Sequence, residues 1–213
     1  MPLGSSGLRK ARGECPVNPV PSKDRVLRLF VGAWPPSEVV AKLSEVRFLV
    51  PDPSRALRWT EPEKLHLTLC FLGALDEGRV SLVESALRES AREFPPIRAR
   101  VAQIGGFPSA LRARVVWAGV DAEGDAIRLL AQSLRIRLQE RGIAFDPKPI
   151  SPHITLARVS RNGRSLGLRL PEGSKTDFGP WTLGIIRLTQ SLQGREGSEY
   201  KSLFEFPLTG AES

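Results

Sequence analysis

The chain of 213 residues is poor in several residue types that mark particular classes of protein. Its two cysteines, Cys15 and Cys70, are too few for a disulfide-stabilised scaffold, which favours a reducing compartment. No apolar run approaches the roughly 18 to 20 residues that span a bilayer, and none near Met1 precedes a small-residue cleavage site. We therefore expect a cytoplasmic protein with no membrane partner.

Metal and nucleotide cofactors also lack their usual signals. A zinc site needs three or four His, Cys or carboxylate ligands, and the two histidines, His66 and His153, have no acidic residue beside them. A phosphate-binding loop needs adjacent Gly and Lys and another Gly five residues earlier. The segment 173–176 (GSKT) has Ser between Gly and Lys, and Gly167 lies six residues before Gly173. We expect neither a metal nor a cofactor.

What the chain does have is positive charge. Its 31 Lys and Arg residues against 23 Asp and Glu give a formal net charge of +8. A basic surface favours polyanions such as RNA or DNA. Many arginine-rich proteins bind no nucleic acid, so the charge alone leaves the class of partner open.

Composition divides the chain into a tail and a folded part. Residues 1–24 are rich in Gly, Ser and Pro and lack apolar periodicity, which predicts a disordered extension. Residues 25–213 alternate between strand-like and helix-like patterns and are expected to form a single domain. The clearest helix pattern runs from 123 to 141, one strand is predicted over 182–192, and the segment between Ser160 and Pro180 is predicted to be a long loop.

The folded part contains a weak internal repeat. A strand at 28–31, a helix and a strand at 65–69 are followed by a similar series whose strands lie at 114–117 and 152–156. The offset between copies is 86 residues for the first strand and 87 for the second. We predict an α+β fold of two antiparallel-sheet lobes related by a pseudo-twofold axis, with outer helices and a central cleft.

Each copy carries the same polar motif. His66-Leu67-Thr68 and His153-Ile154-Thr155 place threonine two residues after histidine within an apolar run. Residues two apart in a strand point to the same face, so each strand offers an imidazole and a hydroxyl to one side. The pseudo-twofold axis would set the two pairs opposite each other across the cleft.

Two imidazoles across a cleft suit the opening of a cyclic phosphodiester. A base must deprotonate water on one side of phosphorus while an acid protonates the leaving oxygen on the other, and histidine can take either part near neutral pH. The threonine hydroxyls can donate hydrogen bonds to the phosphate oxygens as charge builds on them. This chemistry requires no metal.

The paired motifs, with their contexts at 65–73 (LHLTLCFLG) and 152–158 (PHITLAR), resemble those of the two-histidine (2H) phosphoesterase superfamily. More narrowly, residues 26–208 are similar to the RNA 2′,3′-cyclic phosphodiesterases, also called 2′-5′ RNA ligases. The resemblance implies RNA ends bearing a 2′,3′-cyclic phosphate as partners and hydrolysis to a 2′-phosphate. It implies His66 as general acid and His153 as general base, with weak ATP-independent ligation as the reverse reaction.

The resemblance also implies two substrate-binding residues. Phe71, five after His66, would stack on the terminal base, and Arg158, five after His153, would bind phosphate. Strict alternation puts both on the face opposite the histidines. They reach the cleft only where the strands end, twist or bulge; otherwise Phe71 belongs to the core and Arg158 to the solvated surface.

Two other functions remain open. The same site could act on small cyclic nucleotides, or the protein could be a non-catalytic module that binds RNA ends. We expect a monomer.

Overall fold

The computed structural model describes residues 25–52, 55–160, 176–194 and 197–211, so the predicted extension at 1–24 lies outside the described residues. Its strands and helices follow the predicted alternation along the chain. They are β1 (Val26–Ala33), α1 (Ser37–Leu49), β2 (Leu57–Trp59), β3 (Leu67–Asp76), α2 (Val80–Glu93), β4 (Ile97–Phe107), β5 (Val115–Ala122), α3 (Ala126–Glu140), β6 (His153–Val159), β7 (Asp177–Leu183), β8 (Ile185–Gly194) and β9 (Gly197–Pro207).

The strand order confirms the predicted pseudo-twofold arrangement. The strands run β7-β4-β5-β6-β3-β1-β8-β9, with β2 paired to β6, and every described pairing is antiparallel. The order is symmetric about the β6–β3 boundary, where the two motif strands meet. The two lobes are therefore joined edge to edge into one sheet.

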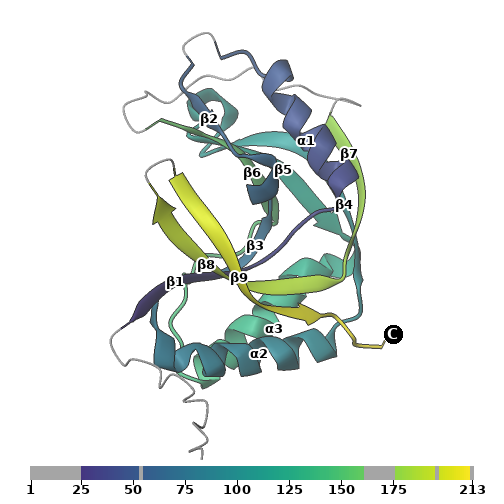
Figure 1. Ribbon diagram of the computed structural model, residues 1–213. Coiled ribbons are helices and arrows are strands. Elements are labelled where there is room, and N and C mark those ends of the chain that lie inside the picture. Colours follow the sequence, from purple (N-terminus) through teal and green to yellow (C-terminus); the bar gives the residue numbers. More distant parts are fainter. Residues whose placement is uncertain (1–24, 53–54, 161–175, 195–196, 212–213) are drawn as a thin grey trace, which may run out of the picture.

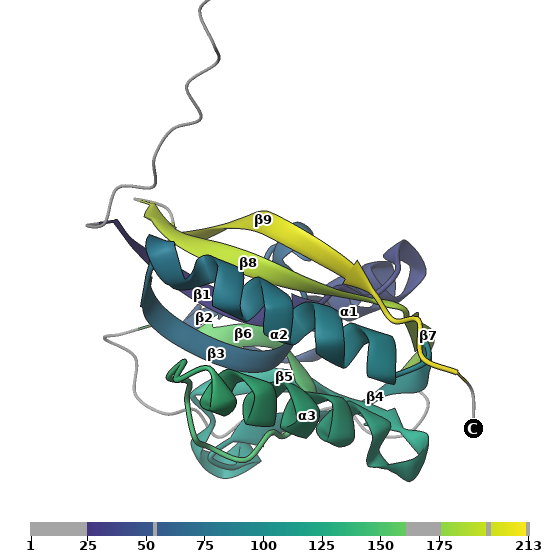
Figure 2. The same cartoon turned by 90° about the horizontal axis from the view of Figure 1, so that it is seen from below.

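The helices exchange between the lobes. Helix α1 follows β1 but packs against β6 and β7 of the other half, while α3 follows β5 but packs against β3 and α2. Figure 1 shows α1 beside β7 at one end of the molecule and α2 with α3 at the opposite end. Seen from below, α2 and α3 lie side by side under the sheet (Figure 2). Each lobe thus completes its outer layer with a helix that follows a strand of the other lobe.

The helix-facing side of the sheet is the predicted apolar side. In β1, Leu27, Leu29 and Val31 alternate toward the core, each at most 4% exposed. In α3 the apolar residues at helical spacing are all buried: Ile127, Leu130, Ala131, Leu134 and Leu138. Burial of this face leaves the opposite side of the central strands free to form a site.

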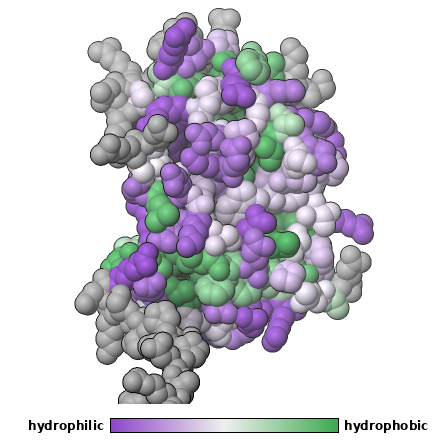
Figure 3. Space-filling view, viewed as in Figure 1, coloured by the Kyte–Doolittle hydropathy of each residue, from purple (hydrophilic) through white to green (hydrophobic). Residues whose placement is uncertain are grey.

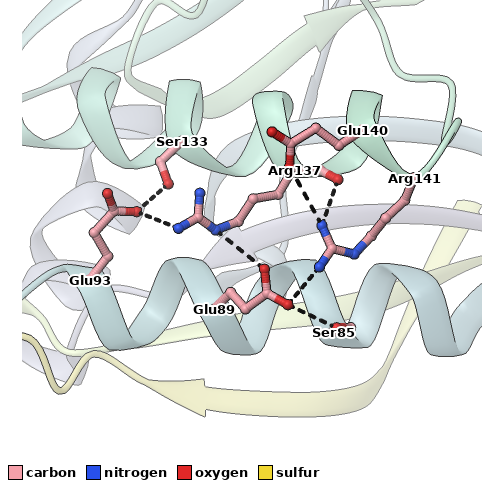
Figure 4. A network of polar contacts seen from close by, with 7 residues as sticks. All are labelled: Ser85, Glu89, Glu93, Ser133, Arg137, Glu140 and Arg141. Carbon is pink, nitrogen blue, oxygen red and sulfur yellow. Dashed lines mark hydrogen bonds and ion pairs between the residues drawn. The ribbon is translucent and has the colours of Figure 1, made fainter.

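Ion pairs and hydrogen bonds also join helices α2 and α3 (Figure 4). The Arg137 guanidinium lies 3.1 Å from Glu93 and 3.7 Å from Glu89, and that of Arg141 lies 2.5 Å from Glu89. Ser133 donates a hydrogen bond to Glu93 at 2.6 Å. Because α2 and α3 follow strands of different lobes, this network links the lobes on the outside of the molecule.

Two predicted segments differ from the structure, and one strand was not predicted. The strand predicted over 182–192 is two strands, β7 and β8, separated at Gly184, because a single glycine within an apolar run does not by itself mark a break. The loop predicted between Ser160 and Pro180 already contains the first residues of β7; its part at 161–175 lies outside the described residues. Strand β2, of three residues, was too short to produce a pattern.

The surface is largely hydrophilic on the face shown in Figure 3, where the largest hydrophobic area lies in the lower half. Among the described helices none is both long enough and apolar enough to cross a membrane.

Candidate active site

A pocket of about 940 Å³ lies where the two motif strands meet. This volume is within the range of small-molecule sites. All the residues that the sequence singled out line it: His66, Thr68, Phe71, His153, Thr155 and Arg158. Their roles remain predictions, but the fold brings them together.

The register of β3 and β6 explains how the two motifs meet. Leu67 pairs with Ile154 in this antiparallel ladder, and both side chains are fully buried on the helix side. His66 lies just before β3, so His66 and Thr68 stand on either side of Leu67, as His153 and Thr155 stand on either side of Ile154. Residues two apart in a strand share a face, so both His–Thr pairs lie on the side opposite the buried Leu67 and Ile154. The pocket floor therefore holds two His–Thr pairs related by the pseudo-twofold axis.

Each imidazole is oriented by a backbone carbonyl two residues before it. The His66 Nδ1 lies 2.7 Å from the Lys64 carbonyl oxygen, and the His153 Nδ1 lies 2.6 Å from that of Ser151. A carbonyl only accepts, so each Nδ1 donates its hydrogen. This leaves Nε2 of both rings for a bound molecule, as an acceptor when the ring is neutral and a donor when it is charged.

The two rings lie in aromatic surroundings of different size. The His66 ring stacks on Trp34, with centroids 5.2 Å apart, and contacts Phe30 at 4.9 Å and Tyr200 at 5.2 Å. The His153 ring contacts Phe107 at 5.1 Å and Trp117 at 6.4 Å. No short sequence pattern predicts that these aromatic residues surround the histidines, because they come from β1, β4, β5, β9 and the β1–α1 connection.

Burial and nearby positive charge favour the neutral form of both rings. Burial lowers the pKa of His66 to about 4; the hydrogen bond to the Lys64 carbonyl opposes this shift in part, and the charges of Arg158 and His153 add smaller downward effects. The pKa of His153 is lowered by burial and by Arg158, while the Ser151 carbonyl opposes the shift. In the free protein at neutral pH, the His66 ring is therefore uncharged.

A bulge in each motif strand brings the fifth residue after histidine to the pocket. On β3, Thr68 pairs with Gly32 and Cys70 with Val31, so Leu69 is the extra residue. Leu69 and Cys70 are both buried, after which Phe71 is 48% exposed. The extra residue shifts the alternation by one position, so Phe71 rejoins the face of His66.

The second motif strand repeats this device. On β6, Thr155 pairs with Trp117 and Ala157 with Val116, which makes Leu156 the extra residue. Arg158 is then exposed toward the pocket. Both bulges fall three residues after the histidine, and they remove the conflict between strict alternation and the predicted positions of Phe71 and Arg158.

Comparison with known proteins gives the relationship. The family described as LigT like Phosphoesterase matches residues 34–117, which include the first motif. An RNA 2′,3′-cyclic phosphodiesterase of Archaeoglobus fulgidus is 32% identical over 180 residues, covering 84% of this chain and 99% of the relative. One of Thermus thermophilus is 34% identical over 192 residues, covering 86% and 91%. The chain belongs to the family of LigT-like RNA 2′,3′-cyclic phosphodiesterases.

Solved structures support the same relationship for the fold. The TT0787 protein of Thermus thermophilus matches with a TM-score of 0.74 and 32% identity, covering 87% of this chain and all of that one. Escherichia coli LigT, solved in complex with 3′-AMP, matches with a TM-score of 0.71 and 26% identity, covering 87% and 99%. The bilobal α+β architecture is thus that of the LigT-like phosphodiesterases.

Within this family member, no group of three or more His, Cys, Asp or Glu side chains in the described residues is placed to hold a metal ion. Strict alternation from His66 would place Cys70 on the face of that histidine, but the bulge turns Cys70 into the core, where it is 1% exposed. Burial raises the pKa of its thiol to about 11. Cys70 therefore stays protonated at neutral pH and belongs to the core.

Proposed function

We propose that this protein hydrolyses the 2′,3′-cyclic phosphate at the end of an RNA chain in the cytoplasm, leaving a 2′-phosphate and a free 3′-hydroxyl. The observation that carries the proposal is the pair of imidazoles related by the pseudo-twofold axis. Both have Nδ1 hydrogen-bonded to a carbonyl, and both line one pocket with a threonine beside them. Relatives that bear the name of this activity match nearly the whole folded chain.

The two rings divide the proton transfers between them. His153 takes a proton from water as the water oxygen attacks phosphorus, and His66 gives a proton to the departing 3′ oxygen. One proton enters the site with water and one leaves with the product, so exchange with solvent restores the starting state. With a 5′-hydroxyl in place of water, the same steps open the cyclic phosphate: the hydroxyl oxygen attacks phosphorus, the 3′ oxygen leaves, and a 2′-5′ linkage forms without ATP.

The other pocket residues act on the phosphate and the base. Thr68 and Thr155 donate hydrogen bonds to the non-bridging oxygens, where charge accumulates in the transition state. Arg158 neutralises the phosphate, and Phe71 offers a ring face to the terminal base. None of these groups requires a metal ion, and activity should be complete in EDTA.

The lowered pKa of His66 fits the acid role once substrate binds. A phosphate anion beside Nε2 favours the charged ring and offsets the effects of burial and Arg158. The imidazolium then forms where it is needed and loses its proton readily to the leaving oxygen.

The test is an oligoribonucleotide ending in a 2′,3′-cyclic phosphate, with the product identified as the 2′- or 3′-phosphate. His66→Ala and His153→Ala should each lower kcat about 10²- to 10⁴-fold, and Thr68→Val and Thr155→Val about 10²-fold. Circular dichroism should show an unchanged fold. Near wild-type turnover by either histidine variant would refute the two-histidine mechanism, and loss of wild-type activity in EDTA would point to a metal.

A further inference from the structure

The pocket continues past Phe71, away from the histidines. Along the β1–β3 ladder Gly32 pairs with Thr68, Phe30 with Phe71, and Arg28 with Ala74. Arg28 therefore lies four residues along β1 from Gly32, the partner of Thr68, a distance of about 13 Å. Phe71, the partner of Phe30, lies between these two positions. Arg28 and Phe71 both line the pocket. Beyond the stacking ring, the pocket thus ends at an arginine.

A second chain segment brings further positive charge to this end. The Asp146 backbone N–H donates to the Phe71 carbonyl oxygen at 2.8 Å, which fixes the segment before β6 beside β3. Lys148, two residues on, lines the pocket with its side chain 85% exposed, and its Nζ lies 3.7 Å from the Asp146 carboxylate. Because most of the Lys148 side chain is exposed, its ammonium can contact a ligand while it is paired with Asp146.

Arg135 of α3 lies behind this end of the pocket. Its guanidinium is 5.6 Å from the centre of the Phe145 ring, and its buried Nε has no hydrogen-bond partner among the described residues. In the same described part of the chain, Arg28 forms no ion pair with an acidic side chain. Three cations and one carboxylate leave a net positive charge where the hydrolysed phosphate does not reach.

We propose that Arg28 and Lys148, with Arg135 behind them, form a second phosphate subsite, which binds the phosphodiester joining the last two nucleotides of the RNA. A cyclic phosphate between the histidines satisfies His66, His153 and Arg158. A nucleoside cyclic phosphate carries no other anion, whereas an RNA chain continues from the 5′ side of the base stacked on Phe71. The subsite rests on the proposed function and makes RNA ends, rather than mononucleotides, the preferred substrate.

The experiment compares a nucleoside 2′,3′-cyclic phosphate with a dinucleotide that ends in the same cyclic nucleotide. The wild-type protein should have the higher kcat/KM for the dinucleotide. Arg28→Gln and Lys148→Gln should each lower the ratio of the two kcat/KM values about tenfold and reduce the salt dependence of the dinucleotide reaction. Arg92→Gln removes an equal charge from an exposed position of α2 outside the pocket and should leave the ratio unchanged.

The other outcomes separate failure of the subsite from failure of the proposed function. A wild-type protein without preference for the dinucleotide, or variants that retain it, would show that no second phosphate is bound there. Equal losses on both substrates would place Arg28 and Lys148 at the reacting phosphate instead. If the wild-type protein hydrolysed neither substrate, the proposed function would fail. Calorimetry with a mononucleotide and a dinucleotide ending in 2′-phosphate would then test the subsite alone, and equal affinities would overturn it.

Discussion

At the scale of single residues, the two histidines are chemically alike but differently enclosed. Both donate Nδ1–H to a carbonyl, yet His66 is packed between Phe30, Trp34 and Tyr200, whereas His153 contacts Phe107 and Trp117. The pseudo-twofold axis therefore relates the two imidazoles but not their surroundings. Under the proposed function, this difference would let two identical side chains take opposite parts in one proton-transfer cycle.

The pKa shifts predict the pH dependence of the reaction. In the free protein both histidine pKa values lie below the ordinary value of 6.5, that of His66 at about 4. The profile of kcat/KM reports the free enzyme, so its optimum should lie on the acid side of pH 6.5. The rate falls at lower pH as the base is protonated and at higher pH as the acid loses its proton. In the profile of kcat, bound phosphate raises both pKa values and moves the optimum toward neutral pH.

Stopped-time assays across a pH series would measure both profiles. Tyr200→Ala opens the aromatic enclosure of His66 to water and should move the limb that belongs to this ring toward higher pH. A kcat/KM optimum well above neutral pH in the wild-type protein would contradict the shifts.

At the scale of elements, the site depends on close approach of the strands. A Cβ atom added at Gly32 would lie 2.9 Å from the Leu67 carbonyl oxygen and 3.4 Å from Cδ2 of His66. The first contact is with backbone, which cannot move aside without shifting β3. Gly32 thus holds β1 against the strand that follows His66.

Gly32→Ala should therefore displace His66 and lower kcat/KM at least tenfold, since small misplacements of reacting groups are costly. It should also destabilise the fold by about 1 to 3 kcal/mol. Steady-state kinetics and urea unfolding would separate the two effects. Gly184→Ala is the matched control, because a Cβ there meets nothing within 4 Å. Full activity of the Gly32 variant would show that the approach does not position the ring.

The elements also show how far sequence patterns reach. The sequence predicted strands at 28–31 and 152–156, where β1 and β6 lie, and a helix at 123–141, where α3 lies. The predicted repeat is out of register by one residue in its first strand. The Phe30–Phe71 pair corresponds to the Val115–Arg158 pair. Phe30 and Val115 are 85 residues apart, one fewer than the predicted offset of 86. The bulges could not be predicted from the sequence, because they depend on which residue of the neighbouring strand pairs with each residue of the motif strand.

At the scale of the whole molecule, the exchange of helices ties the lobes into one unit. The Glu89 carboxylate on α2 contacts both Arg137 and Arg141 of the α3 region, so one side chain bridges the lobes. Partly exposed ion pairs contribute little singly, and networks contribute more. Ionic strength screens both.

Glu89→Gln should lower the free energy of unfolding by about 1 kcal/mol at low salt and by less in 1 M NaCl, with turnover unchanged. Urea unfolding at two salt concentrations would measure this. Glu84→Gln is the control, because the one ion pair of Glu84 among the described residues is with Arg88, 2.6 Å away on the same helix, and such a pair contributes about 0.3 to 0.5 kcal/mol. Equal effects of both variants would show that the network adds nothing between the lobes.

The sequence by itself determined the α+β class, the pseudo-twofold repeat and the two His-x-Thr motifs. These depend on local periodicity and on residue types that few other chemistries use together. Only the tertiary structure decided that Phe71 and Arg158 face the histidines, that aromatic rings from distant strands enclose His66, and that Arg28 and Lys148 lie at the far end of the same pocket. Those relations join residues far apart in the chain, and they arise from strand register, bulges and packing, which the chain acquires only on folding.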